Sequence, residues 1–432
     1  MSQPNTHADP QEMERTRPDR ILYDPTGGRP RAWDDTTFLW LNEHILVQEM
    51  DDDSLLAAWT SEHIGAGPDP GRVWLQRVVT STSRDGGRSW TEPVYVDGSG
   101  IDGGLEAAWQ VPVVAPSSRI YLFYTYGNRG WYASGLRCRT SDDHGRTWSA
   151  PADLPTFPKT AIDSPDPKET PVWICCSGPH RDSRGRVLIP YTRWARNPAI
   201  PAGAAPIREL YCHIEVLCLE NLMDSPDPQN LVFRWLNLAD PVTAPHPKVP
   251  GASIAMEPYL ANLPDGRLFL TIRTNLGELW YSVSEDGGAT WREAEPMRDR
   301  DGGRILLQPS APCPVFGLAR GDFVLLFNNN DGTAFGAPHV WDVANRRPAY
   351  LARGEFRAGA HQPIWWSEPR LLIDNDAIPW GPPGRGRLEA AAYCSLTEHQ
   401  DKRILWYPDR KGFLLGKILP DSLLNSLDVP TG

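Results

Sequence analysis

Short apolar runs recur along the chain, and turn residues rather than a helical repeat separate them. Five such runs lie at residues 55–59, 120–126, 187–191, 268–273 and 323–328. Short runs rich in β-branched and aromatic residues and bounded by turn signals are typical of strands. No long stretch of the sequence shows the 3.6-residue periodicity of an amphipathic helix. The pattern predicts an all-β protein made of many short strands.

An eight-residue motif, S-x-D-x-G-x-x-W, occurs three times. Its copies are residues 83–90 (SRDGGRSW), 141–148 (SDDHGRTW) and 284–291 (SEDGGATW). Ser and Asp side chains accept hydrogen bonds from nearby backbone N–H groups, and Gly supplies the positive φ of a tight hairpin. Trp adds a large apolar group that anchors the turn. We therefore predict that each octet closes a β-hairpin and has no catalytic role.

The spacing of the octets predicts how often the unit repeats. Successive copies start 58 and 143 residues apart, and the larger spacing is about twice 72 residues, one sixth of the 432-residue chain. Many short strands at an even period are typical of a propeller. We expect six blades, at about residues 40–96, 105–155, 168–240, 252–298, 305–372 and 388–418.

We expect a single propeller at residues 33–420, between a loose tail at 1–32 and a C-terminal tail at 421–432. The N-terminal segment is polar and contains several prolines and charges, a composition that does not offset the entropy of ordering. A strand near residues 33–41 is expected to complete the last blade and close the ring.

Composition narrows the class of partner. The chain has 43 basic and 54 acidic residues, a net charge of −11, and no basic stripe, which argues against nucleic acid or a membrane surface as partner. No apolar run approaches the roughly 18 residues of a membrane span. The N-terminal segment lacks the apolar core of a secretory signal, so we expect a cytoplasmic protein.

The cysteine pattern argues against a metal site. The seven cysteines are Cys138, Cys175, Cys176, Cys212, Cys218, Cys313 and Cys394. Their number is odd, two are adjacent and no C-x-x-C pair occurs, so we expect neither a zinc site nor a disulfide framework. We expect reduced, mostly buried thiols and no metal or other cofactor. Residues 51–53 (DDD) are interpreted as a hairpin tip rather than a calcium site.

In a propeller the first strand of each blade faces the axis, so polar residues that open blades converge on one funnel. The blade-opening polar residues are His44 with Glu43, Gln110, Lys168 or Glu169, Glu257, Gln308 and Tyr393. Few of these side chains would be needed on the axis for packing alone. They are therefore candidates for a binding or catalytic site.

The three octets resemble the Asp-boxes, or BNR repeats, of the sialidase (neuraminidase) superfamily. Residues 256–258 (MEP), then 263–268 (LPDGRL), Arg273 and the third octet are similar to the sialidase blade in which a Glu opens the inner strand and an Arg ends the next. Residues 391–396 (AAYCSL) resemble the strand that carries the sialidase tyrosine nucleophile. The resemblance covers residues 40–418 and implies a six-bladed β-propeller with its site on the central axis.

The resemblance implies that Tyr393 is a nucleophile and that Glu257 deprotonates it, because a phenol with a pKa of about 10 is inert at neutral pH without a base. A tyrosine suits an anionic sugar, since a carboxylate nucleophile would be repelled by a substrate carboxylate. Arg273, with Arg410 and Arg347 as further candidates, would clamp the carboxylate through a bidentate fork.

A general acid is also needed, to protonate the leaving oxygen. We expect Glu62, in the loop after the second strand of the first blade, to take this role. His44 is the second option, because an imidazole on the axis could titrate near neutrality. Structural roles remain open for all these residues: ion pairs for Glu257 and the arginines, hydrogen-bonded strand positions for Tyr393 and His44, and an exposed loop carboxylate for Glu62.

We predict an exo-glycosidase of sialidase type that cleaves a terminal acidic sugar from a glycan. The R-I-P tripeptide that supplies the first arginine of sialidases is absent, and its absence favours two alternatives. One is an α-L-rhamnosidase or a polysaccharide lyase acting on uronic-acid glycans with His44 as acid or base. The other is a carbohydrate-binding propeller without catalysis.

Overall fold

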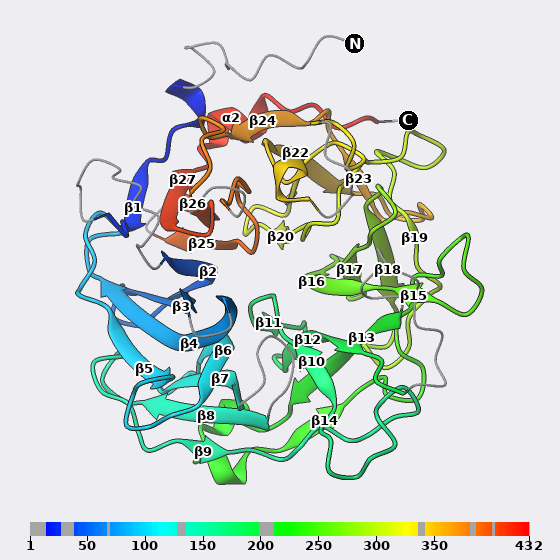
Figure 1. The fold of residues 1–432 in the computed structure, drawn as a ribbon. Coiled ribbons are helices and arrows are strands. Elements are labelled where there is room, and N and C mark those ends of the chain that lie inside the picture. The colour runs from blue at the N-terminus through cyan, green and yellow to red at the C-terminus, as the bar shows by residue number, and fades with distance from the viewer. Residues whose placement is uncertain are drawn as a thin grey trace.

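The computed structural model describes residues 14–26, 39–66, 70–127, 135–197, 211–335, 342–380, 386–399 and 402–431. Within these ranges the strands form six sheets, arranged as a ring around a central axis (Figure 1). The prediction of an all-β, six-bladed propeller is confirmed. The predicted blades coincide closely with the six sheets, because turn residues and short apolar runs mark each strand directly.

Blades 1 to 3 follow in sequence order from the first inner strand. Blade 1 comprises β2 (Leu39–Glu49), β3 (Leu55–Ala66), β4 (Pro70–Ser83) and β5 (Val94–Gly98). Blade 2 comprises β6 (Glu106–Val114), β7 (Ile120–Gly127), β8 (Gly135–Ser141) and β9 (Ala152–Asp153). Blade 3 comprises β10 (Val172–Ile174), β12 (Val187–Trp194), β13 (Tyr211–Leu219) and β14 (Phe233–Trp235), with β11 (His180–Arg181) beside β12 and β15 (Ser253–Ile254) parallel to β13.

Blades 4 to 6 complete the ring. Blade 4 comprises β16 (Met256–Asn262), β17 (Leu268–Arg273), β18 (Trp280–Ser284) and β19 (Glu295–Pro296). Blade 5 comprises β20 (Val315–Gly317), β21 (Phe323–Phe327), β22 (Ala349–Phe356), β23 (Ile364–Trp366) and β24 (Arg370–Ile373). Blade 6 comprises β25 (Ser395–His399), β26 (Lys402–Asp409), β27 (Phe413–Ile418) and β1 (Arg20–Tyr23). The short helices are η2 (Leu222–Asp224), η3 (Pro228–Asn230), η4 (Val343–Asn345) and α2 (Asp421–Asn425).

The hydrophobic core lies between neighbouring blades rather than in one central mass. Blades 2 and 3 share a buried cluster that includes Tyr121 and Tyr191, and blades 4 and 5 share one that includes Phe269 and Trp366. A further cluster joins blade 6 to blade 1 through Trp406 and neighbouring apolar groups. Because each sheet is twisted and apolar on both faces, stacking the blades in a ring buries both faces of every sheet.

The N-terminal strand closes the ring. β1 pairs with β27 in the antiparallel sense, so the outermost strand of blade 6 comes from the opposite end of the chain. The expectation of a loose tail over residues 1–32 was therefore wrong at Arg20–Tyr23. Residues 33–38 of the strand expected to close the ring lie outside the described residues, and the strand that begins at Leu39 is the inner strand of blade 1. A polar tail with one short apolar stretch gives little sequence signal for an edge strand.

The residues assigned to a C-terminal tail pack onto the propeller. α2 buries Leu424, and Leu427 joins the same cluster between blades 5 and 6. Arg320 and Arg403 both form ion pairs with Asp421. The C-terminal segment thus covers the outer end of the last two blades.

Each Asp-box links the third and fourth strands of its blade, as the hairpin prediction requires. In the first octet, Ser83 Oγ accepts a hydrogen bond from Gly87 N at 2.9 Å, and Asp85 Oδ1 accepts from Arg88 N and Ser89 N at 2.9 Å each. Partial burial acts to raise the pKa of Asp85, but these bonds and the Ser89 hydroxyl outweigh it and lower the pKa to about 2. The second and third octets repeat the same bonds.

The octets also hold the blades against one another. Trp90 of the first octet lies edge-to-face on Trp406 of blade 6, with ring centroids 5.4 Å apart. A Cβ on Gly87 would lie 2.3 Å from the Trp406 ring, and a Cβ on Gly145 of the second octet would lie 2.9 Å from Leu56 of blade 1. Each of these octets therefore contacts the preceding blade.

All seven cysteines are buried and free, as predicted. The helices of the described residues are too short and insufficiently apolar to cross a lipid bilayer.

We predict that Gly87→Ala destabilises the protein more than Gly266→Ala. Both glycines have positive φ, 76° and 88°, so both changes carry the same backbone cost of about 1–2 kcal/mol. Only at Gly87 does the added methyl meet Trp406, whereas a Cβ on Gly266 meets nothing within 4 Å. Overpacking should cost Gly87→Ala about a further 1–3 kcal/mol of unfolding free energy in urea titrations. Equal losses in the two variants would contradict this account of the blade contact.

Candidate active site

Three inner strands carry a bulge at the same level of the ring. The pairing register shifts between Glu43 and Leu46 in β2, between Ala108 and Val111 in β6, and between Met256 and Tyr259 in β16. A bulge bends its strand and re-aims the side chain that it carries. In a regular strand, successive side chains point to opposite faces of the sheet. Each bulge interrupts this alternation and directs one side chain toward the axis.

The residues at these bulges have left-handed backbone. The φ angles are 58° at His44, 56° at Trp109 and 43° at Glu257, and Tyr393 before β25 has 65°. Non-glycine residues in this region store strain, which concentrates at functional sites. The rings of His44, Trp109 and Tyr393 lie edge-to-face with centroids 5.5–6.1 Å apart, so the three blades that supply these rings meet at one place.

Glu257, Arg273 and Tyr393 form one hydrogen-bonded group on the axis. Tyr393 Oη donates to Glu257 Oε1 at 3.0 Å, and Arg273 Nη1 forms an ion pair with Glu257 Oε2. Arg273 Nη1 also lies 3.4 Å from Tyr393 Oη, while Nε and Nη2 contact Ser310 Oγ at 3.2 and 3.1 Å. The exposed fractions are only 4% for Tyr393 and 5% for Glu257. The sequence prediction that these three residues share the axis therefore agrees with the geometry.

Burial raises the pKa of Tyr393 well above its ordinary value, and the Glu257 carboxylate raises it further against the opposing charge of Arg273. The phenol is therefore protonated at rest and has a carboxylate in position to accept its proton. That is the arrangement a tyrosine needs in order to attack an electrophilic carbon.

Arg346 is a buried arginine that interacts electrostatically with this group and that sequence analysis missed. The residue is 8% exposed, and burial followed by the charge of Arg273 lowers its pKa, while Tyr393, Glu389 and Glu257 oppose the shift. The sequence prediction chose its neighbour Arg347, whose guanidinium instead pairs with Asp374 at 2.8 Å. Both residues follow η4 in an irregular segment, where no periodicity tells which side chain faces the axis.

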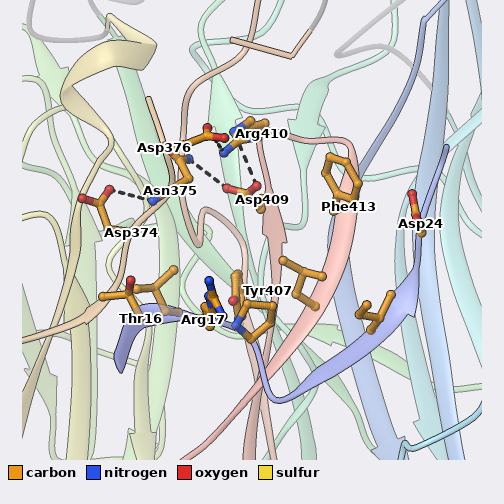
Figure 2. Close-up of a pocket in the computed structure, with 14 residues that line it drawn as sticks. Thr16, Arg17, Asp24, Asp374, Asn375, Asp376, Tyr407, Asp409, Arg410 and Phe413 are labelled. Atoms are coloured by element: carbon orange, nitrogen blue, oxygen red, sulfur yellow. Dashed lines mark hydrogen bonds and ion pairs between the residues drawn. The ribbon is translucent and has the colours of Figure 1, made fainter. Parts of the chain in front are cut away.

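In the turn between β26 and β27, the sequence prediction was again wrong by one position. Arg410 was the predicted ligand, but Figure 2 shows it beside Asp376 and Asp409, with ion-pair distances of 2.5 and 3.5 Å. They line a pocket of about 320 Å³ whose wall includes Ile21 of the outermost strand. The next residue, Lys411, is the one that lies at the axis, with Nζ 5.5 Å from the Tyr393 ring centroid.

Glu62 lies in β3 rather than in a loop, so its predicted local setting was wrong. The strand continues to Ala66, and Glu62 is 2% exposed. Its Oε1 accepts from Gln76 Nε2 at 2.7 Å. Burial, and then the neighbouring Glu43 carboxylate, raise the pKa of Glu62 so far that the carboxyl keeps its proton at neutral pH. A buried, protonated carboxyl is what a general acid requires.

His44 is fully buried, and burial lowers its pKa to about 4. Its imidazole is therefore neutral at physiological pH and fitted to accept a proton rather than to donate one.

The amide of Gln110 is used in structural hydrogen bonds, since Nε2 donates to the carbonyls of His44 and Ala58 and Oε1 accepts from the Thr60 hydroxyl. Lys168 is exposed in a turn before β10. The geometry therefore does not bring Gln110 or Lys168 to the hydrogen-bonded group of Tyr393.

One exposed group offers possible metal ligands. Atoms of Asp51, Asp52 and His144 lie within 4.8 Å of one another, at the β2–β3 turn and the second Asp-box. Asp51 already bonds His144 at 3.0 Å and the Ser118 hydroxyl. These contacts join neighbouring turns, in line with the prediction of a hairpin tip.

Comparison with known proteins agrees with this architecture. Residues 53–197 match the BNR repeat-like domain family. The search of curated proteins finds no match. Among solved structures, a protein of unknown function from Dyadobacter fermentans is similar at a TM-score of 0.58 and 14% identity, over 94% of this chain and 98% of the other.

Two glycan-active enzymes are also similar. The intramolecular trans-sialidase of Ruminococcus gnavus, solved with oseltamivir carboxylate, matches at a TM-score of 0.57 and 15% identity, over 94% of this chain and 97% of that one. The α-L-arabinanase of Penicillium chrysogenum, solved with arabinobiose, matches at 0.50 and 12%, over 92% and 100%.

The chain shares the six-bladed propeller fold of these structures. Similarity at this level of identity shows the fold and leaves the chemistry to the residues on the axis. The ionisable residues that act on one another there are Glu43, Glu62, Glu257, Arg273, Arg346, Arg387, Glu389, Tyr393 and Lys411, hereafter the axial cluster.

We predict that Glu62 makes the stability of the propeller fall as pH rises. Because its pKa is raised in the folded state, its contribution is complete below the unfolded pKa of about 4.3 and is lost on the way up to the folded pKa. The unfolding free energy of the wild type relative to Glu62→Gln should fall by up to about 1.4 kcal/mol per pH unit in that window. Urea titrations at a series of pH values measure this difference. A difference that does not change with pH would show that Glu62 is ionised normally.

Proposed function

We propose that the protein is a retaining exo-glycosidase that uses Tyr393 as its nucleophile and acts on a terminal acidic sugar. The observation that carries the proposal is the hydrogen bond from the buried Tyr393 phenol to Glu257, with Arg273 paired to the same carboxylate. A strand tyrosine needs no carboxylate of this kind for packing. The strained backbone at both residues adds support, because it is retained where geometry matters for function.

The reaction has two steps. In the first, Tyr393 Oη bonds to the anomeric carbon as Glu257 takes the phenol proton, and Glu62 gives its proton to the departing glycosidic oxygen. In the second, Glu62 as carboxylate takes a proton from water, whose oxygen bonds to the anomeric carbon. The C–O bond to Tyr393 breaks, and the phenolate recovers its proton from Glu257. The residues return to their starting state.

The charge of the axial cluster supports an acidic sugar. By formal charge, four basic side chains, Arg273, Arg346, Arg387 and Lys411, face three acidic ones, Glu43, Glu257 and Glu389, besides the protonated Glu62. One substrate carboxylate brings this cluster to neutrality. Arg273 contacts the nucleophile and Arg346 interacts electrostatically with it, so these two arginines replace the predicted set of Arg273, Arg410 and Arg347 as the proposed carboxylate ligands.

The neutral His44 favours one second candidate, a lyase acting on uronic-acid glycans. An imidazole with its pKa lowered to about 4 is a base at neutral pH, as proton abstraction next to a uronate carboxylate requires. The two reactions leave different products, a reducing sugar after hydrolysis and an unsaturated uronate after elimination.

We expect Tyr393→Phe to lower kcat for the preferred aryl glycoside by a factor of about 10³ or more, since it removes the nucleophile. The panel contains sialosides, glucuronides and rhamnosides. A fluorinated analogue of the preferred sugar should label wild-type Tyr393 covalently, as mass spectrometry of the peptide would show. Tyr407→Phe is the matched control, because Tyr407 is a buried strand tyrosine of the same blade. Full turnover in Tyr393→Phe with loss in His44→Ala would favour the lyase, and binding of glycans without turnover would leave a binding module.

We expect Arg346→Lys to raise KM for an acidic glycoside about tenfold or more relative to its uncharged analogue, because a lysine cannot replace a bidentate guanidinium. Arg347→Lys is the control, as its side chain pairs with Asp374. Steady-state kinetics of both variants on both substrates measure the effect. An equal rise in KM for the acidic and the uncharged substrate would argue against a carboxylate at Arg346.

A further inference from the structure

Two buried glutamates lie side by side on one face of blade 1. Glu43 of β2 stands opposite Thr60 of β3, and Glu62 lies two residues further along β3 on the same face. Each residue is 2% exposed, and the two carboxyl groups are close enough for each to shift the pKa of the other. Two carboxylates cannot both be ionised at such a separation without water, so the pair holds one proton.

The surroundings of the pair are asymmetric. Lys411 Nζ forms an ion pair with Glu43 Oε2, and a guanidinium, that of Arg387, also favours the charged form of Glu43. Although burial acts to raise it, the pKa of Glu43 is therefore lowered. Among the described residues, the donor that the structure shows on Glu62 is the uncharged amide of Gln76. The ammonium group of Lys411 is therefore paired with Glu43, and the shared proton is favoured on Glu62.

The position of Lys411 is built into the backbone. Gly412 N donates to Asp409 O at 3.0 Å, and the two residues between them, Arg410 and Lys411, have φ of 54° and 47°. These are the angles of a type I′ turn, for which Asn-Gly is the usual pair. Two long cationic side chains here are a conformational cost that a simple hairpin would not carry.

Blade 1 fixes this turn in place. Asn42 N donates to Lys411 O at 2.6 Å, and Asn42 Nδ2 donates to Gly412 O at 3.1 Å. On the other side, Arg410 is tied to Asp376. Lys411 is therefore held by its own backbone next to the residue that precedes Glu43, with its side chain between Glu43 and the ring of Tyr393.

We propose that Glu43 and Lys411 are positioning residues that keep the shared proton on Glu62, so that Glu62 is the group that protonates the leaving oxygen. The inference rests on the proposed glycosidase function and deepens it by assigning the proton. The charged and titratable groups that face the pair are Lys411 from the β26–β27 turn, Arg387 and Tyr393 from the segment before β25, and His44 next to Glu43 in β2.

Glu43→Gln and Lys411→Met should shift the pKa of Glu62 in opposite directions. Glu43→Gln removes the negative charge that raises the pKa of Glu62, so the basic limb of kcat/KM should shift to lower pH by about one unit or more. Lys411→Met removes a positive charge that lowers both pKa values, so the limb should shift to higher pH. Lys411→Arg should restore the limb to its wild-type position. Lys417→Met, which removes a lysine from outer strand β27, is the control for loss of charge.

A merely structural role for Glu43 and Lys411 would lower activity at every pH without moving either limb, and that result would overturn the proposal. A limb that shifts the same way in both variants would overturn it too. Each outcome depends on the pH at which kcat/KM declines and not on the size of kcat/KM. A variant with low activity therefore still tests whether Glu62 holds the proton.

Titration of the substrate-free protein separates this inference from the proposed function. Difference infrared spectroscopy should show a protonated carboxyl at neutral pH that is absent in Glu62→Gln and titrates lower in Glu43→Gln. This band in a protein that turns over no glycoside would support the proton assignment and refute the glycosidase. Absence of the band from wild type, with Tyr393 still labelled by the fluorinated sugar, would refute the proton assignment and leave the glycosidase.

Discussion

Burial of charge at the axis is the constraint that orders the rest of this molecule. Inner strands from the blades converge there, and every ionised side chain that they carry must find its counter-charge inside a region with little water. Glu257 is matched by Arg273, Glu43 by Lys411 and Glu389 by Arg387. The first pair lies within blade 4 and the third within the segment before β25, whereas Glu43 and Lys411 come from blades 1 and 6. The ring must therefore close correctly before Glu43 is satisfied, so this part of the site is completed only by closure.

The ring closes at the junction of blades 6 and 1 through two sets of contacts, one at the outer edge of the ring and one near the axis. Outside, β1 adds itself to β27, and the first Asp-box packs on Trp406. Inside, the turn that carries Lys411 is bonded to Asn42. The outer contacts supply apolar burial, which has no direction. The inner hydrogen bonds and ion pairs are directional, so they fix the register at which the last blade meets the first.

The sequence predicted the parts of this structure that local chemistry determines. The Asp-box motif predicts the turn that it forms, and apolar runs of five to seven residues predict strands. The spacing of these features then predicted the number of blades. Glu257 and Arg273 were found because a blade motif with fixed spacing carries them, and Tyr393 because residues 391–396 resemble the strand that carries the sialidase nucleophile. Arg346 and Lys411 were each missed by one residue, since they lie in turns where left-handed or irregular backbone decides which neighbour faces inward. The ring-closing strand Arg20–Tyr23 was missed because its partner lies at the other end of the chain, where no local pattern reports it.

The charge of the axial cluster also bears on how the proposed reaction could proceed in a dry site. A substrate carboxylate would neutralise the single excess cation. When Tyr393 attacks, its proton passes to Glu257, which becomes neutral, and the proton of Glu62 leaves with the aglycone, so Glu62 becomes charged. One carboxylate gains the charge that the other loses, and the sum inside the cluster is unchanged. An overall charge of −11 opposes the approach of an acidic sugar, but salt screens the interactions of exposed charges. The charges buried in the axial cluster are screened far less, so in the proposed reaction they would decide which substrate is held.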